Sequence, residues 1–400
     1  MTMFFSGPGQ TFSVSAFIDP IIAEFGWSRS LISSLYAAGT LVAGFTMTLM
    51  GRLVDAKGYR TMLLVVVTCL ACACLLMSFV FNPMMILVAF IGLRIFGQGS
   101  MTLIPNSLVP QWFITKRARA MSLVALGIMV SSALLPYINT LVIEAVGWRN
   151  AWRLWAVLLL VIMAPAAYFL VRNRPEDMGL LPDNAAPSTE VDSLEKPVDE
   201  VAFTLERALR TSAFWIVLLA GSVPAMVGTG LTFHHMSILV ENGLSQAAAA
   251  GVFTVTALVA FPCTLIAGVL CDRWSLRIIF SLTLLVGVVT LFLYPIAATP
   301  AAAAVLGVMR GIEQGFLTII AGVIWPQYFG RRYLASIRGV ATMAMVLGSA
   351  LGPPLFGAAY DLFGGYREVS LATAALPLAA AISALFLKEP KDTGPSRALA

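Results

Sequence analysis

The sequence predicts an all-α membrane protein in which twelve transmembrane helices form two pseudo-symmetric six-helix bundles. Of its 400 residues, 59% are hydrophobic and only 11% are charged, and the mean hydropathy is +0.89. Soluble chains carry roughly 25% charged residues, so this composition excludes a soluble domain. The apolar runs are long enough to cross ~30 Å of hydrocarbon. In that environment a helix pairs its own backbone N–H and C=O groups, so we expect the runs to be helical. The predicted spans are 2–24, 30–50, 61–82, 84–108, 120–142, 150–172, 212–240, 246–270, 277–297, 301–325, 335–360 and 367–388.

Two of these spans carry related sequences. Residues 94–113 read RIFGQGSMTLIPNSLVPQWF and residues 310–329 read RGIEQGFLTIIAGVIWPQYF, with Arg, Gln-Gly, Thr, Ile, Pro-Gln and Phe at matching positions. Each copy places one arginine well inside an apolar run. A guanidinium keeps its charge, so at membrane depth it must face protein, a cavity or an anion. The repeat therefore indicates two matched halves built around Arg94 and Arg310.

The basic residues predict how the chain lies in the membrane. If both termini are cytoplasmic, most of the 25 lysines and arginines fall in cytoplasmic loops and the tail, which is the positive-inside pattern. We expect a multi-pass protein of the cell inner (plasma) membrane, surrounded by lipid. The net charge of +5 needs no nucleic-acid partner to explain it. The repeat partner of the first span starts near Thr211, which maps before Met1, so we expect a few further residues before the start.

The repeat also divides the chain into domains. Residues 1–172 form the first predicted bundle, and residues 212–400 form the second bundle with a short tail. Between them, residues 173–211 are the one polar stretch long enough for a linker. Its first part is rich in Pro, Asp and Glu, and its end, VAFTLERALRT, predicts a short amphipathic helix at the cytoplasmic surface. Within the first span, Pro8 and its flanking glycines permit the backbone to bend.

A charged motif after the second span recurs in the other half. Residues 51–60 read GRLVDAKGYR, and residues 268–277, which lie 217 positions later, read GVLCDRWSLR. The glycine allows helices to approach closely, and the aspartate can cap a helix start and pair with a nearby cation. These features predict an electrostatic gate that breaks and reforms as the halves rock, and a solvated turn is the alternative. The candidate gating residues are Gly51, Asp55, Arg60, Asp272 and Arg273.

The pattern Gly-x-Leu-x-Asp-x-x-Gly-x-Arg resembles the signature loop of the major facilitator superfamily, and the repeat extends the resemblance over nearly the whole chain. Further segments, and the pair His234-His235, are similar to bacterial members of the monocarboxylate transporter and oxalate:formate antiporter branch. These segments are GWSRS, QWFITKRARAMSL, GWRNAW, RNRPEDMGLLPD and TSAFW. That branch moves small organic anions, often with a proton. It commonly has an arginine in span eight, around residues 261–264, where this sequence has none.

The resemblance implies that spans one, four, seven and ten line a central cavity, and these spans contain the unusual polar residues. Arg94 with Gln98, and Arg310 with Gln314, are i,i+4 pairs that share a helix face. Glu313 lies one turn from Arg310 and can reach it. The predicted substrate-binding residues are Arg310, Arg94, Gln314, Gln98, His234 and Gln10. The predicted proton-coupling residues are Glu313 and Asp19.

Several of these residues have a structural alternative. Arg94 can be a structural arginine bonded to neighbouring helices, and Asp19, beside Pro20, can be a surface cap at the outer end of its helix. His234 and His235 point ~100° apart on a helix, so we expect only one to face the cavity. Titration near neutrality would suit proton coupling, and a packing histidine with satisfied hydrogen bonds is the alternative.

These observations predict a secondary active transporter that moves a small, monocarboxylate-like organic anion by alternating access, together with a proton. One alternative is a drug or metabolite/proton antiporter of the same fold, and another is a membrane sensor that binds without transport. We expect no enzyme, because GxxxxGK, GxSxG and HExxH patterns are absent from the sequence. We also expect no cofactor, no metal site and a monomer.

Overall fold

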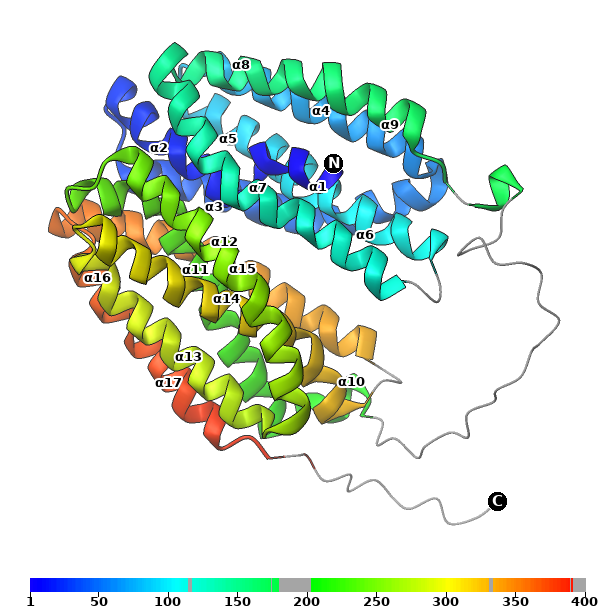
Figure 1. Ribbon diagram of the computed structural model, residues 1–400, viewed down its shortest axis with the longest axis vertical. Coiled ribbons are helices and arrows are strands. Elements are labelled where there is room, and N and C mark those ends of the chain that lie inside the picture. The colour runs from blue at the N-terminus through cyan, green and yellow to red at the C-terminus, as the bar shows by residue number, and fades with distance from the viewer. Residues whose placement is uncertain (114–116, 174, 180–202, 331–333, 389, 391–400) are drawn as a thin grey trace.

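The computed structural model describes residues 1–113, 117–173, 175–179, 203–330, 334–388 and 390, whose regular elements are all helical (Figure 1). The first bundle contains α1 (Thr2–Phe5), η1 (Gly7–Gly9), α2 (Thr11–Phe25), α3 (Arg29–Lys57), α4 (Tyr59–Ser78), α5 (Pro83–Gly92), η2 (Leu93–Ser100), α6 (Met101–Trp112), α7 (Arg117–Val146), α8 (Trp148–Leu158), η3 (Leu159–Met163) and α9 (Ala164–Leu170). The second contains α11 (Ser212–Glu241), α12 (Gln246–Arg273), α13 (Leu276–Leu293), η6 (Tyr294–Ile296), α14 (Pro300–Phe329), α15 (Leu334–Phe363), α16 (Arg367–Thr373) and α17 (Ala375–Leu385). Between the bundles lie η4 (Glu176–Met178) and α10 (Leu205–Leu209).

Within the described residues, eleven helical segments are long and apolar enough to cross a membrane, and they correspond to the second to twelfth predicted spans. The first predicted span is divided into α1, η1 and α2 instead. Pro8 lacks a backbone N–H, and Gln10 after it is extended, with φ −84° and ψ 143°. The bend that the Gly-Pro-Gly sequence predicts is therefore confirmed, and the first predicted span is present as a broken segment.

The two halves start and end their helices with the same local chemistry. Ser28 and Ser245, which are 217 positions apart, each accept a backbone N–H from the first turn of α3 and of α12. Asn82 and Thr299 do the same for α5 and α14 at the same offset. Such capping satisfies donors that the helix itself leaves unpaired. Glycines with positive φ follow helices at matching positions, namely Gly26 and Gly243, and Gly147 and Gly364.

The two bundles contact each other at one end and diverge toward the other (Figure 1). Across the boundary α3 packs on α15, α7 on α12 and α2 on α11. The contacting end, which we call the closed end, contains the turns at residues 26–28 and 242–245. The opposite end, which we call the open end, contains the end of α3 at Lys57. At the closed end Gly357 brings α15 against α3, since a Cβ there would lie 2.9 Å from the carbonyl oxygen of Arg29.

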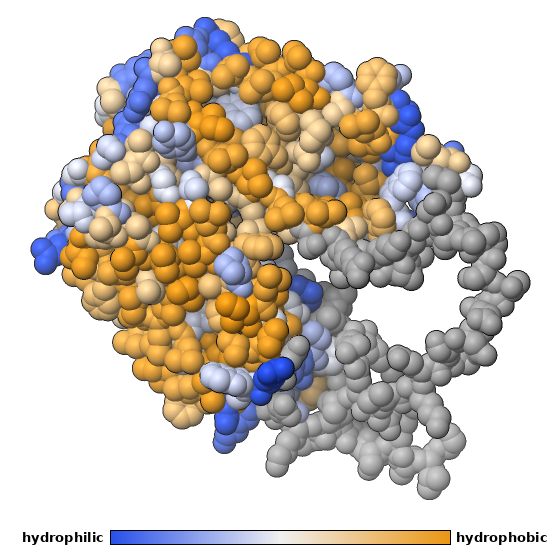
Figure 2. Space-filling model, in the orientation of Figure 1, coloured by the Kyte–Doolittle hydropathy of each residue, from blue (hydrophilic) through white to orange (hydrophobic). Residues whose placement is uncertain are grey.

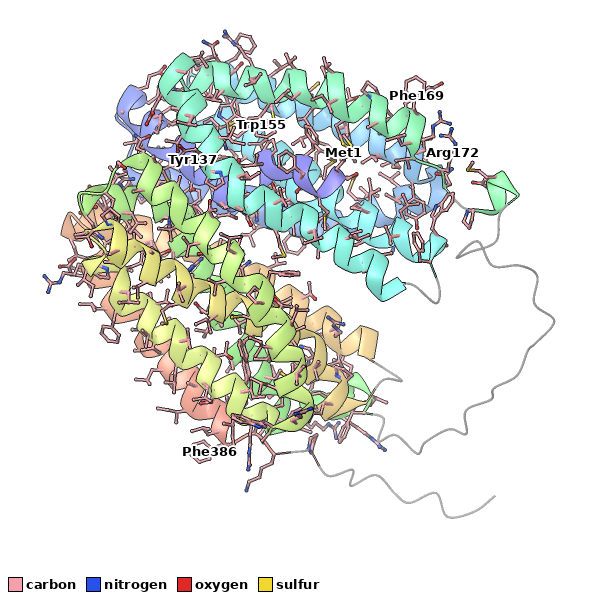
Figure 3. The ribbon with its side chains drawn as sticks, in the orientation of Figure 1. Met1, Tyr137, Trp155, Phe169, Arg172 and Phe386 are labelled. Carbon is pink, nitrogen blue, oxygen red and sulfur yellow. The ribbon has the colours of Figure 1, made fainter. Side chains whose placement is uncertain are left out.

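Each bundle has its own buried core. The first bundle has one cluster that includes Phe17 and Trp152, whereas the second has two, one around Phe214 and one around Phe356. Hydrophobic side chains cover most of the visible flank of both bundles (Figure 2), as contact with lipid requires. Arg172 and Phe386, which follow the last spans of the two bundles, lie far apart at the open end (Figure 3).

Candidate functional site

A cavity between the bundles brings predicted residues of both halves together. It has two adjoining lobes of ≈ 510 Å³ and ≈ 430 Å³, each within the range of small-molecule sites. Arg94 and Gln98 line the first lobe, which we call the Arg94 lobe. Gln10 and Arg310 line the second, which we call the Arg310 lobe. Residues common to both lobes are Ala225, Thr229, Ala321 and Met345.

Arg94 is held in the wall of the first bundle. It lies in η2, a π-helical stretch, and is only 4% exposed. Its Nη1 donates to the hydroxyl of Tyr36 at 2.8 Å and, at 3.4 Å, to the carbonyl oxygen of Gly9. The chain is extended at Gln10, and the backbone N–H of Ser13 donates to the carbonyl oxygen of Gln10. The carbonyl oxygen of Gly9 therefore lies outside the helical hydrogen bonds and can accept from Arg94. The alternative of a structural arginine therefore describes part of its role.

Two polar atoms in the same wall have no hydrogen-bond partner in the described part of the chain. They are Nε of Arg94 and Oε1 of Gln98, one a donor and the other an acceptor. Buried polar groups in native structures nearly always have partners, and π-helical turns within α-helices occur frequently at functional sites. The wall of the Arg94 lobe therefore contains one donor and one acceptor that are buried without a partner.

The guanidinium of Arg310 makes fewer hydrogen bonds within the described part of the protein than that of Arg94. It is half-buried in α14, and its Nη2 donates to the hydroxyl of Thr232 on α11 at 2.9 Å. Among the described residues its guanidinium makes no other hydrogen bond. A guanidinium has five N–H donors, so Arg310 keeps donors for an anion in its lobe. Gln314, one turn further along α14, lines the same lobe.

Glu313 does not pair with Arg310 in this structure. Among the described residues no ion pair within 4.0 Å joins the two side chains, so the reach predicted from one helical turn is not used here. The Glu313 carboxylate lies against Gly287 of α13, where a Cβ would come within 2.7 Å of its Oε1. Gly287 thus makes room for a carboxylate that still lines the Arg310 lobe.

The adjacent histidines form hydrogen bonds between helices of the second bundle. His234 places Nε2 3.0 Å from the carbonyl oxygen of Pro353 and Nδ1 2.9 Å from the hydroxyl of Tyr366. His235 likewise contacts a carbonyl oxygen of α12 and the hydroxyl of Tyr294. A carbonyl only accepts, so Nε2 donates in both rings, and in the neutral form of each ring Nδ1 accepts from the tyrosine hydroxyl. Both are fully buried and line neither lobe, contrary to the prediction that His234 binds substrate.

Asp19 belongs to the contact between bundles at the closed end. Its carboxylate accepts from Nη1 of Arg29 at 2.6 Å and from the hydroxyl of Ser237 on α11 at 2.7 Å. The guanidinium carbon of Arg29 lies 4.5 Å from the ring centroid of Tyr360, and Asp361 accepts the backbone N–H of Arg29. Asp19 lies inside α2, so the alternative of a surface cap is wrong, and it lines neither lobe.

The predicted gating residues lie at the open end, where the bundles diverge. A Cβ on Gly51 would meet nothing within 4 Å, so the close helix approach predicted for it is absent here. The guanidinium carbon of Arg60 lies 4.4 Å from a tyrosine ring centroid within its own bundle, and Arg273 is exposed at the end of α12. Gly58 occupies the cap position of α4 that was predicted for an aspartate. The side chains of Asp55 and Asp272 lie outside the described residues.

The cavity contains polar residues that the sequence analysis missed. Arg338, near the start of α15, lines the Arg94 lobe and adds a third guanidinium. In the sequence it counts among the cytoplasmic basic residues, and its place just inside a span was the only signal. Thr229 and Ser349 share a hydrogen bond of 3.0 Å between α11 and α15 and line the same lobe.

Comparisons with known proteins place this geometry in a family. The model of the Major Facilitator Superfamily matches residues 1–264 and again residues 235–399. Monocarboxylate transporter 13 of Bos taurus and of Rattus norvegicus are each 24% identical over 371 residues, which is 92% of this chain and 82% of theirs.

Two solved structures share the fold. Both are titled as a bacterial homolog of the human lysosomal transporter Spinster in an inward-facing conformation, one unoccupied and one occupied. The first has a TM-score of 0.73 at 14% identity and covers 96% of this chain and 95% of its own. The second has a TM-score of 0.71 at 15% identity, with 98% and 97% covered. With family matches that run from its first residue almost to its last, and two bundles around a shared cavity, this multi-pass membrane protein belongs to the major facilitator superfamily of transporters and resembles its monocarboxylate branch.

Proposed function

We propose that this transporter binds a small organic anion in the central cavity and moves it by alternating access. The observation that carries the proposal is the charge of the cavity. Among the described residues that line it, the guanidiniums of Arg94, Arg310 and Arg338 outnumber the one carboxylate, which is that of Glu313. An anion there gains charge-assisted hydrogen bonds and relieves the cost of keeping cations in a low dielectric. A cationic drug would meet like charges instead.

The conformation fits the inward-facing state of such a cycle. The bundles meet at the closed end, and the open end contains basic residues such as Lys57, Arg60 and Arg273. The positive-inside pattern favours a cytoplasmic position for that end in the inner membrane. Rocking of the two bundles around the cavity would part the closed end and bring the open end together.

Glu313 is the residue that couples transport to protons in this proposal. It lines the same lobe as Arg310 and lies one helical turn away without pairing to it. When Glu313 is protonated, Arg310 is left to the substrate. After release, the ionised carboxylate can swing from Gly287 to the arginine and hold the empty site.

The names of the curated relatives support a carboxylate as the substrate. The arginine that the monocarboxylate branch commonly has in span eight is absent from α12 here. The neighbouring helix α14, which packs closely on α12, provides Arg310 instead. The carboxylate would thus be bound from the adjacent wall of the same cavity.

Counterflow in proteoliposomes tests the proposal with labelled mono- and dicarboxylates, a sugar and a cationic drug. We expect only carboxylates to exchange. Arg310→Lys should weaken binding about tenfold, because lysine lacks the planar fork that binds a carboxylate through two hydrogen bonds. Arg210→Lys is the control, since Arg210 is 77% exposed and pairs with Glu206 at the surface.

Three outcomes would contradict the proposal. Exchange of the cationic drug alone would favour the antiporter alternative. Binding of a carboxylate without any counterflow would favour the sensor alternative. Unchanged carboxylate affinity in Arg310→Ala would place the anion site elsewhere.

A further inference from the structure

A third cavity opens inside the second bundle, beside the two lobes. It has a volume of ≈ 230 Å³ and lies between α11, α13, α14 and α15. None of its lining residues is charged. They include Val217, Phe280, Leu317, Ile320, Ile324 and Trp325. We call this cavity the apolar chamber.

The apolar chamber adjoins both lobes. Pro224 and Leu317 line the chamber and the Arg310 lobe, and Trp325 lines the chamber and the Arg94 lobe. On α14, Arg310 and Leu317 lie two turns apart on the same face. At a rise of 1.5 Å per residue they are roughly 10 Å apart along the helix axis. The Arg310 guanidinium bonds to Thr232, and the lining of the chamber on α11 begins seven residues away, at Ala225. A ligand held at Arg310 must therefore extend roughly 10 Å to enter the chamber.

The lining chemistry decides what can fill the chamber. Water needs polar partners to occupy a buried cavity, and the walls here are hydrocarbon and aromatic. An empty cavity of this kind forfeits packing contacts, whereas an apolar group placed in it removes its own surface from water. A cavity of about 150 Å³ already holds a benzene molecule, so the chamber has room for a substituted phenyl group.

Resting on the proposed function, we infer that the transported anion is an amphiphilic monocarboxylate. Its carboxylate binds Arg310, and a flexible alkyl chain carries its aryl or branched-alkyl body into the apolar chamber. Acids without such a body, such as acetate and lactate, bind at Arg310 and leave the chamber unfilled. The chamber is thus the part of the site that selects among carboxylates.

Calorimetry on the purified protein tests this with acetate, 8-phenyloctanoate and 8-(pyren-1-yl)octanoate, since the alkyl chain is long enough to span the distance from Arg310 to the chamber. 8-Phenyloctanoate should bind about tenfold or more tightly than acetate, because even one methylene in an apolar pocket changes affinity by about tenfold. The pyrenyl acid carries four fused rings, which exceed the chamber, and should bind more weakly than 8-phenyloctanoate. A series with equal affinities would overturn the inference.

Two glycines of α11 offer matched variants. Gly221 lines the apolar chamber and Gly228 lines the Arg310 lobe, and a Cβ on either would meet nothing within 4 Å. Gly221→Leu should weaken 8-phenyloctanoate about tenfold and leave acetate unchanged, whereas Gly228→Leu should weaken both acids. Gly322→Leu should change neither, because Gly322 has the same open space at Cβ and lines none of the three cavities.

The outcomes separate the inference from the proposed function. If Gly221→Leu weakens both acids equally, or neither, the chamber does not bind the apolar body, and anion transport still stands. If neither acid binds the wild-type protein, and no carboxylate exchanges in counterflow, the proposed function is wrong. If Gly221→Leu does not fold, the wild-type series alone decides, since it needs no variant.

Discussion

Arg29 joins the two bundles through its guanidinium, which pairs with Asp19 of its own bundle at 2.6 Å and lies 4.5 Å from the ring centroid of Tyr360 in the other. Ser237 of the second bundle donates to the same carboxylate at 2.7 Å. Behind this contact, burial raises the pKa of Tyr366, so its hydroxyl stays protonated and donates to a buried histidine of α11. The closed end is therefore held by one linked polar cluster.

We expect Asp19→Asn to increase the fraction of molecules in which the closed end is parted. The substitution removes the negative charge to which Ser237 of the second bundle donates at 2.7 Å. A hydrogen bond to a charged group is about 1 kcal/mol stronger than one between neutral groups, which corresponds to about a fivefold change in population. Spin labels at Val146 and Leu362, both exposed at the closed end of different bundles, should show a new longer distance by double electron–electron resonance.

Glu24→Gln is the matched control for this prediction. Glu24 pairs with Arg149 at 2.7 Å within the first bundle, as Asp19 does with Arg29, but its hydrogen bonds in the described part of the chain come from Trp148 and Arg149 of the same bundle. Its loss should leave the distance distribution unchanged. An equal shift in both variants would show that the Asp19 pair has no specific role between the bundles.

We expect His235→Ala to destabilise the protein without changing the pH dependence of transport. The substitution creates a buried cavity and leaves the hydroxyl of Tyr294 without its partner, for a combined cost of about 3 kcal/mol. Thermal unfolding should show the loss, and the pH profile of counterflow should match the wild type in shape. A changed profile at unchanged stability would return the histidine to a coupling role.

Much of the fold follows from the sequence because its signals are local. Ser28 and Ser245 start equivalent helices, and the Gly-Pro-Gly sequence around Pro8 breaks the first span, through interactions within a few residues. The same holds for the helix lengths, which the apolar runs determine. These features need no knowledge of which helices are neighbours.

The assignment of side chains to the cavity could not be predicted in the same way. Helix α11 is apolar on all faces, so no amphipathic pattern distinguishes the face toward the cavity from the face toward other helices. His234 faces other helices of its own bundle because its partners Pro353 and Tyr366, more than a hundred residues away in sequence, lie beside it. Arg338 looks like a loop residue until α15 is placed against the Arg94 lobe.

We expect Glu313→Gln to bind and exchange substrate but to lose accumulation driven by a pH gradient. A carboxamide keeps the shape and cannot release a proton, so the exchange step survives while coupling is lost. Gly287→Ala provides a second test, because its Cβ would displace the carboxylate from its present place and should alter the pH profile without removing the acid. Full pH-driven uptake in Glu313→Gln would assign coupling to another group.

Arg94 allows a last prediction because it bonds to its own bundle and also lines the cavity. Tyr36→Phe removes the 2.8 Å hydrogen bond to Nη1 and should cost about 1 kcal/mol of stability, while anion affinity stays within about twofold, because the guanidinium itself remains. Arg94→Lys removes the unpaired Nε and the planar fork, so it should lower both stability and affinity. Thermal unfolding and calorimetry with acetate measure the two effects separately. If Arg94→Lys lowered stability alone, Arg94 would be structural and the anion would be bound by Arg310 without it.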